Sequence, residues 1–528
     1  MKEFFFSQKS GSKWLVFMTI SLVWAFVLFA TGAYESGMHF MDDSRIVSLQ
    51  DRFETQGYFN TLIQSIASDL NIRFRSFYFI EHITLAYLLG ANWKAWAVHH
   101  FFIALLTSFL LTQVYRKLGL PTVFSTALAI FLLLGTQSEV FFRTSPAERT
   151  GLLLLILGVF IWLHLRKKHE WYKYLAVFCV ILAGFTKETF IITIPALIFG
   201  AFWYEKKSLS LNDAKHFFEQ TWKPVSLLIL FMAVSITFIV LKIGGNSIGY
   251  VGIESRLERL LYLIWGVEAK MNLKGILMQI GLVSTNLKTL SHYGLWTLLF
   301  LLAALSFFLA TPEKGKPKRN RFIPWLAIGI LFLAFYLPQF LIYIKTGFRV
   351  RYLLPVSGAY GLLIGFSYLK CRQEELMRKL LTGLLLVATT HQFFIATNEA
   401  VQYAKEGQQI EATLSYLKKY EPSKILFVAD PAYHFEPTHA MEVYIKKAVH
   451  NETTIFTYFT EGEQHLAADL LKRRAHQRTR LVRCEAVNTF QTIILFKKAR
   501  PLFLARNCVS SERYNIQDFE TLQVWTRK

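Results

Sequence analysis

Long apolar segments, repeated along most of the chain, constrain the fold of this protein more than any other feature. A helix needs about 20 mostly apolar residues to cross a bilayer, because each residue rises about 1.5 Å through ~30 Å of hydrocarbon. We count eleven segments near that length, at residues 14–34, 96–114, 122–139, 149–165, 173–186, 189–204, 225–243, 295–310, 322–344, 352–369 and 380–397. The sequence therefore predicts a mainly α, polytopic membrane protein with about eleven spans.

The composition agrees with a membrane protein. Of the 528 residues, 53% are hydrophobic and only 18% are charged, which is too apolar for a soluble multidomain protein. The net charge of +22 comes from Lys and Arg residues that stand mostly in short loops between the apolar segments. There they orient the chain in the bilayer and contact anionic lipid headgroups. We therefore expect the lipid bilayer as a partner and exclude nucleic acid.

The cations between the segments predict which side of the membrane each loop faces. The densest group lies at residues 314–321, and further groups precede the first segment and follow the second, fourth and tenth. All of them fall on one side if the N-terminus is cytoplasmic, as the positive-inside rule requires. We expect a multi-pass protein of the cell membrane, the inner membrane in a bacterium, with its C-terminus outside the cytoplasm. One span more or fewer within 173–204 would reverse everything downstream.

Three regions on the expected outer side are too polar to span: 35–95, 244–294 and everything after about residue 398. We therefore divide the chain into a transmembrane domain, 1–397, with the first two regions as external loops, and an external domain, 398–528. Within the first loop, residues 77–90 are apolar but number only 14. That length suits a helix at the membrane interface or a re-entrant segment.

In the external domain the apolar runs shorten to strand length. We expect strands at 424–429, 454–459, 492–496 and 522–526, and helices at 398–420, 438–449 and 463–474. This alternation is typical of a small α/β domain. The domain also contains Cys484 and Cys508. In an oxidising compartment they would form one disulfide, and the alternative is two buried thiols.

The first external loop carries a pair of carboxylates, Asp42 and Asp43, eight residues after the first apolar segment. A carboxylate at the membrane surface can accept a proton from a hydroxyl group that attacks a substrate. The same residues also suit the start of a surface helix, with no role in catalysis. The chain has no zinc-protease helix, paired CxxC motif, Walker loop or dinucleotide-binding glycine fingerprint. Metalloprotease, ATPase and nucleotide-cofactor functions are accordingly disfavoured.

Further polar residues follow the Asp pair in a definite order. They are Arg75, Gly90, Trp96 and His99, then Glu139, Lys187-Glu188 with Pro195, and the run RYLLP at 351–355. This ordered set resembles the C-type glycosyltransferase superfamily, integral membrane enzymes that use polyprenyl-phosphate sugars. It is most similar to the protein O-mannosyltransferases with tetratricopeptide tails, although an α/β domain stands here where they carry that tail.

The resemblance implies a fold, an activity and a set of site residues. The activity would be transfer of a sugar, with inversion, from a polyprenyl-phosphate carrier to an extracytoplasmic acceptor. The residues would be Asp42 as base with Asp43 beside it, Arg351, Arg75 and Lys187 at the phosphate, and His99 and Glu139 at the substrate cavity. Cationic side chains can stabilise the leaving phosphate, so no divalent metal is required, and its participation is left open. The resemblance identifies neither the sugar nor the acceptor.

The same residues also fit roles outside catalysis. Arg351 and Lys187 would equally be cations reaching from span ends to the membrane surface, and Lys187 would then pair with Glu188. His99 would be a satisfied polar group near the interface, and Glu139 would pair in water with its charged neighbours Arg143, Glu148 and Arg149. Charges within the bilayer would also mark the pathway of a secondary transporter or lipid-linked-glycan flippase, although no two-fold internal repeat is evident. A non-enzymatic assembly factor is a third possibility.

Overall fold

The computed structural model places most of the chain in two compact units. It describes residues 10–40, 43–71, 73–207, 209–243, 319–343, 354–371, 375–429, 431–448, 454–459, 480–482, 484–505, 508–509, 511–519 and 521–528. The first unit contains residues 1–30, 62–82 and 98–399, and the second contains 31–61, 83–97 and 400–528. The division at 399/400 lies beside the domain boundary expected at 397/398, whereas parts of the expected loop 35–95 group with the C-terminal residues.

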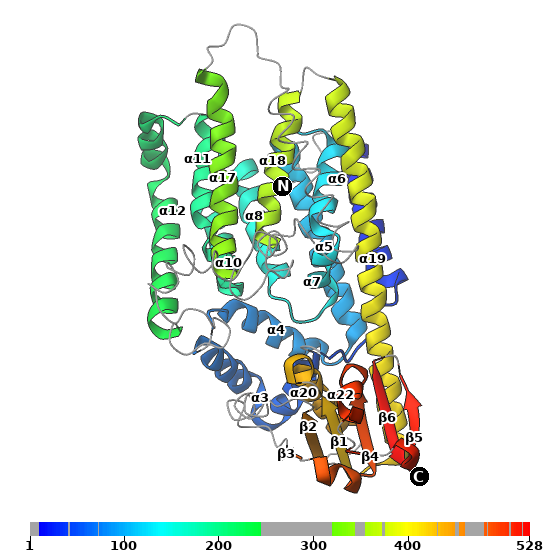
Figure 1. Cartoon of the computed structure of the whole chain (residues 1–528). Coiled ribbons are helices and arrows are strands. Elements are labelled where there is room, and N and C mark those ends of the chain that lie inside the picture. Colours follow the sequence, from blue (N-terminus) through cyan, green and yellow to red (C-terminus); the bar gives the residue numbers. More distant parts are fainter. Residues whose placement is uncertain are drawn as a thin grey trace, which may run out of the picture. The chain divides into compact units, whose positions relative to one another are not determined.

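Helices make up the first unit. They are α2 (Ser10–Ala25) with η1 (Phe26–Ala30), α6 (Thr122–Leu133), η2 (Thr136–Ser138), α7 (Glu139–Phe142), α8 (Glu148–Leu165), α9 (Trp171–Thr186), α10 (Glu188–Ile191), α11 (Ile194–Lys206), α12 (Leu211–Phe238) with η3 (Ile239–Ile243), α17 (Arg319–Tyr343) and α18 (Leu354–Lys370). Four more contribute residues to both units: α3 (Asp43–Leu70), α4 (Ser76–Leu89), α5 (Trp93–Lys117) and α19 (Glu375–Tyr420). Figure 1 shows α11, α17 and α18 running side by side.

Several of these helices can cross a membrane. Within the described residues, five are long and apolar enough: Lys13–Ala30, Trp93–Lys117, Glu148–Leu165, Leu211–Leu241 and Glu375–Tyr420. The predicted mainly α, multi-pass membrane protein is therefore confirmed. The count of eleven spans is not, because other predicted spans coincide with shorter helices and the segment 295–310 lies outside the described residues.

The span predicted at 122–139 differs from the structure. Helix α6 ends at Leu133, and the helical turns at 136–142 follow at an angle of 72°. Between them Gly135 has a φ of 91°, which glycine adopts at little steric cost and which no helix continues through. The apolar run therefore forms a broken segment rather than one straight helix.

Two glycines bring α8 and α9 close together. Gly151 and Gly158 are seven residues apart, which places them on one face of α8. A Cβ atom on Gly158 would lie 2.9 Å from the carbonyl oxygen of Ala176, and one on Gly151 would lie 2.4 Å from the hydroxyl of Thr186. Small residues of this kind allow membrane helices to approach until their backbones touch.

A six-stranded sheet forms the centre of the second unit, with strand order β3-β2-β1-β4-β6-β5. The strands are β1 (Lys424–Ala429), β2 (Thr454–Phe459), β3 (Arg480–Leu481), β4 (Thr492–Phe496), β5 (Tyr514–Asp518) and β6 (Leu522–Arg527). Strands β3, β2, β1 and β4 are parallel, and β6 and β5 add antiparallel to the β4 edge. All four predicted strands are present, whereas β3 and β5 were not predicted.

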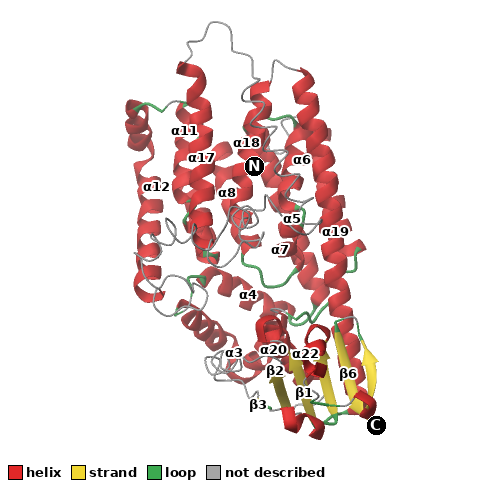
Figure 2. Ribbon diagram, in the orientation of Figure 1, coloured by secondary structure: helices red, strands yellow, loops and turns green. Residues whose placement is uncertain are grey.

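The sheet is covered by helices whose apolar faces complete its core. Helices α20 (Pro431–Ala448) and α22 (Arg500–Ala505) pack against the strands, as Figure 2 shows. Leu414 and Leu417 of α19 and Tyr444 of α20 belong to the same buried cluster as the strands. The short 3-10 helices are Cys484–Thr489, Lys497–Ala499 and Ser511–Arg513. The predicted α/β domain is confirmed, although the helix predicted at 463–474 lies outside the described residues.

Cys484 and Cys508 form a disulfide, with their Cα atoms 5.0 Å apart. The structure thus decides between the two alternatives that the sequence left open. Disulfides persist in oxidising compartments, which agrees with the extracytoplasmic side expected for this unit. Cys179 and Cys371, in the first unit, are buried free thiols.

We expect Gly158→Ala to lower the free energy of unfolding by about 1–3 kcal/mol, because its methyl group meets a backbone oxygen that cannot move aside. The matched control is Gly329→Ala in α17, where a Cβ would meet no atom of the described residues within 4 Å. That change should be neutral or slightly stabilising, since Ala favours a helix over Gly by about 1 kcal/mol. Thermal unfolding of both full-length variants in detergent measures the difference, and equal midpoints would contradict the close α8–α9 packing.

Candidate functional site

In the second unit, the residues before α3 are organised around His39. Its Nδ1 lies 2.6 Å from Oδ2 of Asp43, and its Nε2 lies 3.0 Å from the carbonyl oxygen of Tyr403. The His39 and Tyr403 rings stack at 3.4 Å. The imidazole thus joins the Asp43 carboxyl group to the backbone of α19, and His39, Asp43 and Tyr403 are all buried.

Asp43 is therefore held inside the protein. It is 1% exposed and is the first residue of α3, where the helix dipole favours a carboxylate. The predicted helix at the Asp pair is confirmed, and Asp43 takes part in it as a buried structural carboxylate. Asp42 lies outside the described residues.

The backbone around His39 is fixed by α19 and α20. The hydroxyl of Tyr444 donates to the carbonyl of His39 at 2.6 Å, and the backbone N–H of Phe40 donates to Glu406 at 3.1 Å. A Cβ atom on Gly407 would lie 2.9 Å from the carbonyl oxygen of Gly37, so α19 approaches this segment directly. These contacts fix the residues that precede Asp42 in the sequence.

In the first unit, charged side chains gather where α8 and α10 begin. We call the following six the charged network: Asp69, Arg75, Glu148, Arg149, Lys187 and Glu188. Helix α9 stops at Thr186 because Lys187 is extended, with a φ of −161°. The Lys187 ammonium donates to the Glu148 carboxylate, and these residues are only 8% and 4% exposed. This ion pair joins the break after α9 to the first turn of α8.

Glu188 extends the network to the segment before α4. Its Oε1 accepts a hydrogen bond from the backbone N–H of Phe74 at 2.8 Å. Since Lys187 and Glu188 are consecutive, the extended break after α9 holds α8 through one residue and the 73–75 segment through the other. Arg75 is the next residue of that segment.

The Arg75 side chain is partly buried, and its environment is negatively charged. Its guanidinium donates to Asp69 Oδ1 at 2.7 Å and lies 5.4 Å from the ring of Tyr78. Burial alone would lower the pKa of Arg75. The negative charges of Asp69 and Glu188 act in the opposite direction and together outweigh burial, so the pKa of Arg75 lies above its ordinary value. Nε of Arg75 is buried and has no hydrogen-bond partner within the described part of the chain. That donor is available to an anionic oxygen.

Arg149 closes the loop that leads into α8. Its guanidinium donates to the carbonyl oxygens of Arg143, at 2.6 Å, and Thr144, at 2.8 Å. Arg143 in turn lies 3.3 Å from the carboxylate of Glu139, and both side chains are partly exposed. Glu139 thus forms a local ion pair, which is one of the two roles that the sequence suggested for it.

His99 lies beside the network through Glu81. His99 Nε2 is 3.6 Å from Glu81 Oε1, and the hydroxyl of Thr150 donates to the same oxygen at 2.7 Å. Thr150 follows Arg149 in α8, so this group continues the charged network along that helix. At 3.6 Å the imidazole and the carboxylate are not hydrogen-bonded to each other, and both are side chains that can hydrogen-bond a hydroxyl group.

The structure brings four of the predicted site residues into one part of the first unit: Arg75, Lys187, His99 and Glu139. Arg351 lies outside the described residues. Lys187 was expected to pair with its neighbour Glu188, and the structure instead shows its pair with Glu148, 39 residues away. Sequence reasoning missed Asp69 as the partner of Arg75. No group of three or more His, Cys, Asp or Glu among the described residues could hold a metal ion.

Comparison with known proteins finds a similarity of fold. No protein-family model and no curated protein matches the chain. Among solved structures, the crystal structure of ArnT from Cupriavidus metallidurans bound to undecaprenyl phosphate is similar, at 13% identity and a TM-score of 0.48, covering 97% of each chain. A sequence identity and a TM-score this low assign neither activity nor substrate to the present chain.

We expect Lys187→Met to destabilise the protein by about 3–5 kcal/mol, because it leaves the Glu148 carboxylate buried without its counter-ion. Adding Glu148→Leu should restore most of the loss, since an apolar pair of similar size replaces the buried ions. As a control, Lys379→Met breaks the exposed pair with Glu375 and should cost less than about 1 kcal/mol. Denaturant unfolding of the full chain measures all three. A Lys187→Met protein as stable as the control would contradict the buried pair.

Proposed function

We propose that this protein is a membrane glycosyltransferase that transfers a sugar from a polyprenyl-phosphate carrier to an extracytoplasmic acceptor, with inversion. The observation that carries the proposal is the charged network, three cations and three carboxylates held at the ends of apolar helices. Ionisable groups are expensive in a bilayer protein and mark functional sites when they cluster. The order of motifs that resembles the C-type glycosyltransferases supports the choice of reaction.

The reaction requires a base for the acceptor proton and groups that stabilise the leaving phosphate. The acceptor oxygen attacks the anomeric carbon while the bond from that carbon to the phosphate oxygen breaks. The acceptor proton must go to a base, and the polyprenyl phosphate must leave as an anion. Cations placed near the leaving oxygen lower the barrier, because the charge develops in a site of low dielectric.

Arg75 is the described residue best suited to the phosphate. It carries a permanent charge, its planar guanidinium matches phosphate oxygens, and its Nε has a donor to spare among the described residues. Asp69 orients the guanidinium through a hydrogen bond, and Glu188 fixes the backbone of the preceding residue, Phe74. We assign Arg351 the same task on the strength of its place in the RYLLP motif. Lys187 is engaged with Glu148 and holds the start of α8, whereas Glu188 holds the 73–75 segment that leads to Arg75.

Asp42 is assigned the role of base, and Asp43 a structural one. Asp43 is buried and engaged with His39, so it is poorly placed to accept a proton from an acceptor. Asp42 is the remaining carboxylate of the pair. His39 and Phe40, which precede it in the sequence, are anchored to α20 and α19.

We expect Asp42→Asn to lower the transfer rate by about 10²–10⁴-fold, because general-base catalysis is lost, with no change in thermal stability. Asp43→Asn is the matched variant: it should lower the unfolding midpoint by weakening the buried hydrogen bond to His39. The assay incubates the purified full-length protein with a panel of polyprenyl-phosphate sugars and follows release of the carrier phosphate. Unchanged turnover in Asp42→Asn would remove the proposed base. No turnover with any donor, combined with flipping of labelled lipid-linked glycan in vesicles, would favour the flippase alternative.

We expect Arg75→Gln to reduce kcat/KM by about 10²–10³-fold, because a charged donor to the leaving phosphate is lost. That variant also leaves Asp69 partly buried without its cation, so its stability falls too. The double variant Arg75→Gln with Asp69→Asn separates the effects, since two neutral partners can still hydrogen-bond. Recovery of both stability and activity in the double variant would reduce Arg75 to a structural residue; recovery of stability alone is the expected result.

A further inference from the structure

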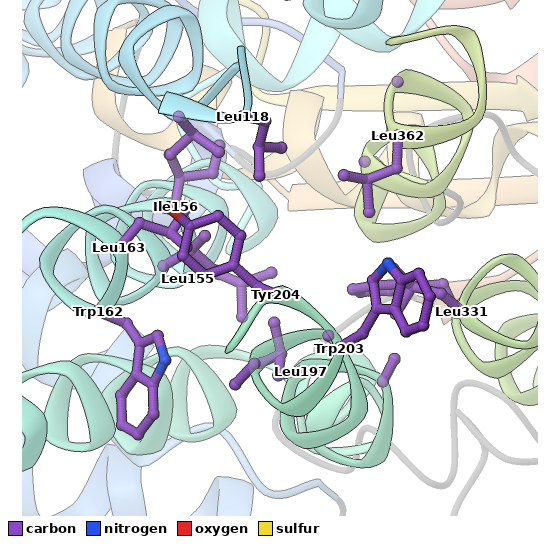
Figure 3. Close-up of a pocket in the computed structure, with 18 of the residues that line it drawn as sticks. Leu118, Leu155, Ile156, Trp162, Leu163, Leu197, Trp203, Tyr204, Leu331 and Leu362 are labelled. Carbon is purple, nitrogen blue, oxygen red and sulfur yellow. The ribbon is translucent and has the colours of Figure 1, made fainter. Parts of the chain in front are cut away.

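The first unit contains an apolar cavity that the proposed reaction does not use. It measures about 480 Å³, within the range of about 300–1,000 Å³ that is typical of ligand pockets. Its walls come from α5, α6, α8, α9, α11, α12, α17 and α18, and most are Leu, Val, Ile and Ala. Figure 3 shows Trp203 and Tyr204 of α11 lying between Leu155 and Ile156 on one side and Leu331 and Leu362 on the other.

Two lysines stand at one end of this cavity. Lys370 is the last residue of α18, and Lys207 directly follows α11, and both line the cavity. Lys207 Nζ lies 5.2 Å from the centre of the Tyr204 ring, and Lys370 Nζ lies 5.5 Å from that of Phe366. Neither lysine pairs with a carboxylate within the described part of the chain. The cavity therefore has an apolar body and a cationic mouth.

Aromatic residues mark this mouth as the level of the lipid headgroups. Trp162 and Tyr204 line the cavity, and the guanidinium of Arg166 lies 5.7 and 5.5 Å from their rings. Trp and Tyr concentrate at membrane interfaces. Arg166 is neutralised by Glu205, 2.6 Å away, whereas Lys207 and Lys370 have no carboxylate partner among the described residues. By the positive-inside rule these helix ends face the cytoplasm.

We propose that this cavity is a binding site for one anionic phospholipid of the cytoplasmic leaflet, with an acyl chain between the helices and the phosphate between Lys207 and Lys370. An apolar space of this size is filled by hydrocarbon rather than by water, because it offers water few polar partners. A free phosphate would leave the body of the cavity empty. The polyprenyl-phosphate donor is expected to react on the opposite side of the membrane, so the phospholipid is the occupant whose headgroup meets the lysines. This site is independent of the proposed transferase reaction.

The test measures lipid binding to the full-length protein by native mass spectrometry, with dioleoyl phosphatidylglycerol and dioleoyl phosphatidylcholine as probes. The wild type should bind one phosphatidylglycerol about 30-fold more tightly than phosphatidylcholine, since two cations each favour an anionic headgroup. The double variant Lys207→Gln with Lys370→Gln should bind both lipids equally. Equal affinities in the wild type, or a preference that survives in the double variant, would overturn the proposal.

A matched pair of glycines tests the hydrocarbon part of the site. Gly358 lines the cavity, and a Cβ there would meet none of the described atoms within 4 Å, so Gly358→Phe is expected to fill the space without a clash with the described backbone. Gly329 is equally open but is not among the cavity residues. Gly358→Phe should abolish the tightly bound lipid, and Gly329→Phe should retain it. Retention in both, or displacement of phosphatidylglycerol by an equimolar polyprenyl phosphate, would contradict a phospholipid site.

Discussion

The Lys187–Glu148 ion pair is the interaction on which the arrangement of the first unit depends. Both charges are buried among apolar helices, where an isolated charge is strongly unfavourable, so each requires the other. Helix α9 stops at this point, and Glu188, the next residue, fixes the backbone of Phe74. One short extended segment thus secures the start of α8 and the residue before Arg75.

This arrangement explains how a mostly apolar protein can present a cation to a substrate. The charged network balances three cations against three carboxylates, so it is stable without a ligand. Arg75 has a buried donor that is unused among the described residues, and the pKa of Arg75 is raised by its acidic neighbours. An arriving phosphate would find an oriented guanidinium and need to reorganise little, which is the condition for effective electrostatic stabilisation.

The fold could be predicted where one physical signal dominates. Long apolar segments predicted the helices, and short apolar runs predicted β1, β2, β4 and β6. Strand β5 was missed because it is an exposed edge with polar side chains, and β3 because it has two residues. The ion pairs of the candidate site were harder to predict, because they join residues that are far apart in the sequence. Lys187 was expected to pair with the adjacent Glu188, whereas the structure shows that it pairs with Glu148. The order of residues in the sequence also could not reveal that Asp43 is buried against His39, because Asp42 beside it has the same side chain.

The decisive step of the proposed reaction is cleavage of the bond between a sugar and a polyprenyl-linked phosphate. Phosphorus-31 NMR of the purified protein with a polyprenyl-phosphate sugar and an acceptor follows this step, because the donor is a phosphodiester and the released carrier is a phosphomonoester. We expect the diester resonance to decay as the monoester appears, with one new glycosidic bond of inverted configuration for each monoester formed. A diester signal that stays constant with every donor tried would contradict the proposed function.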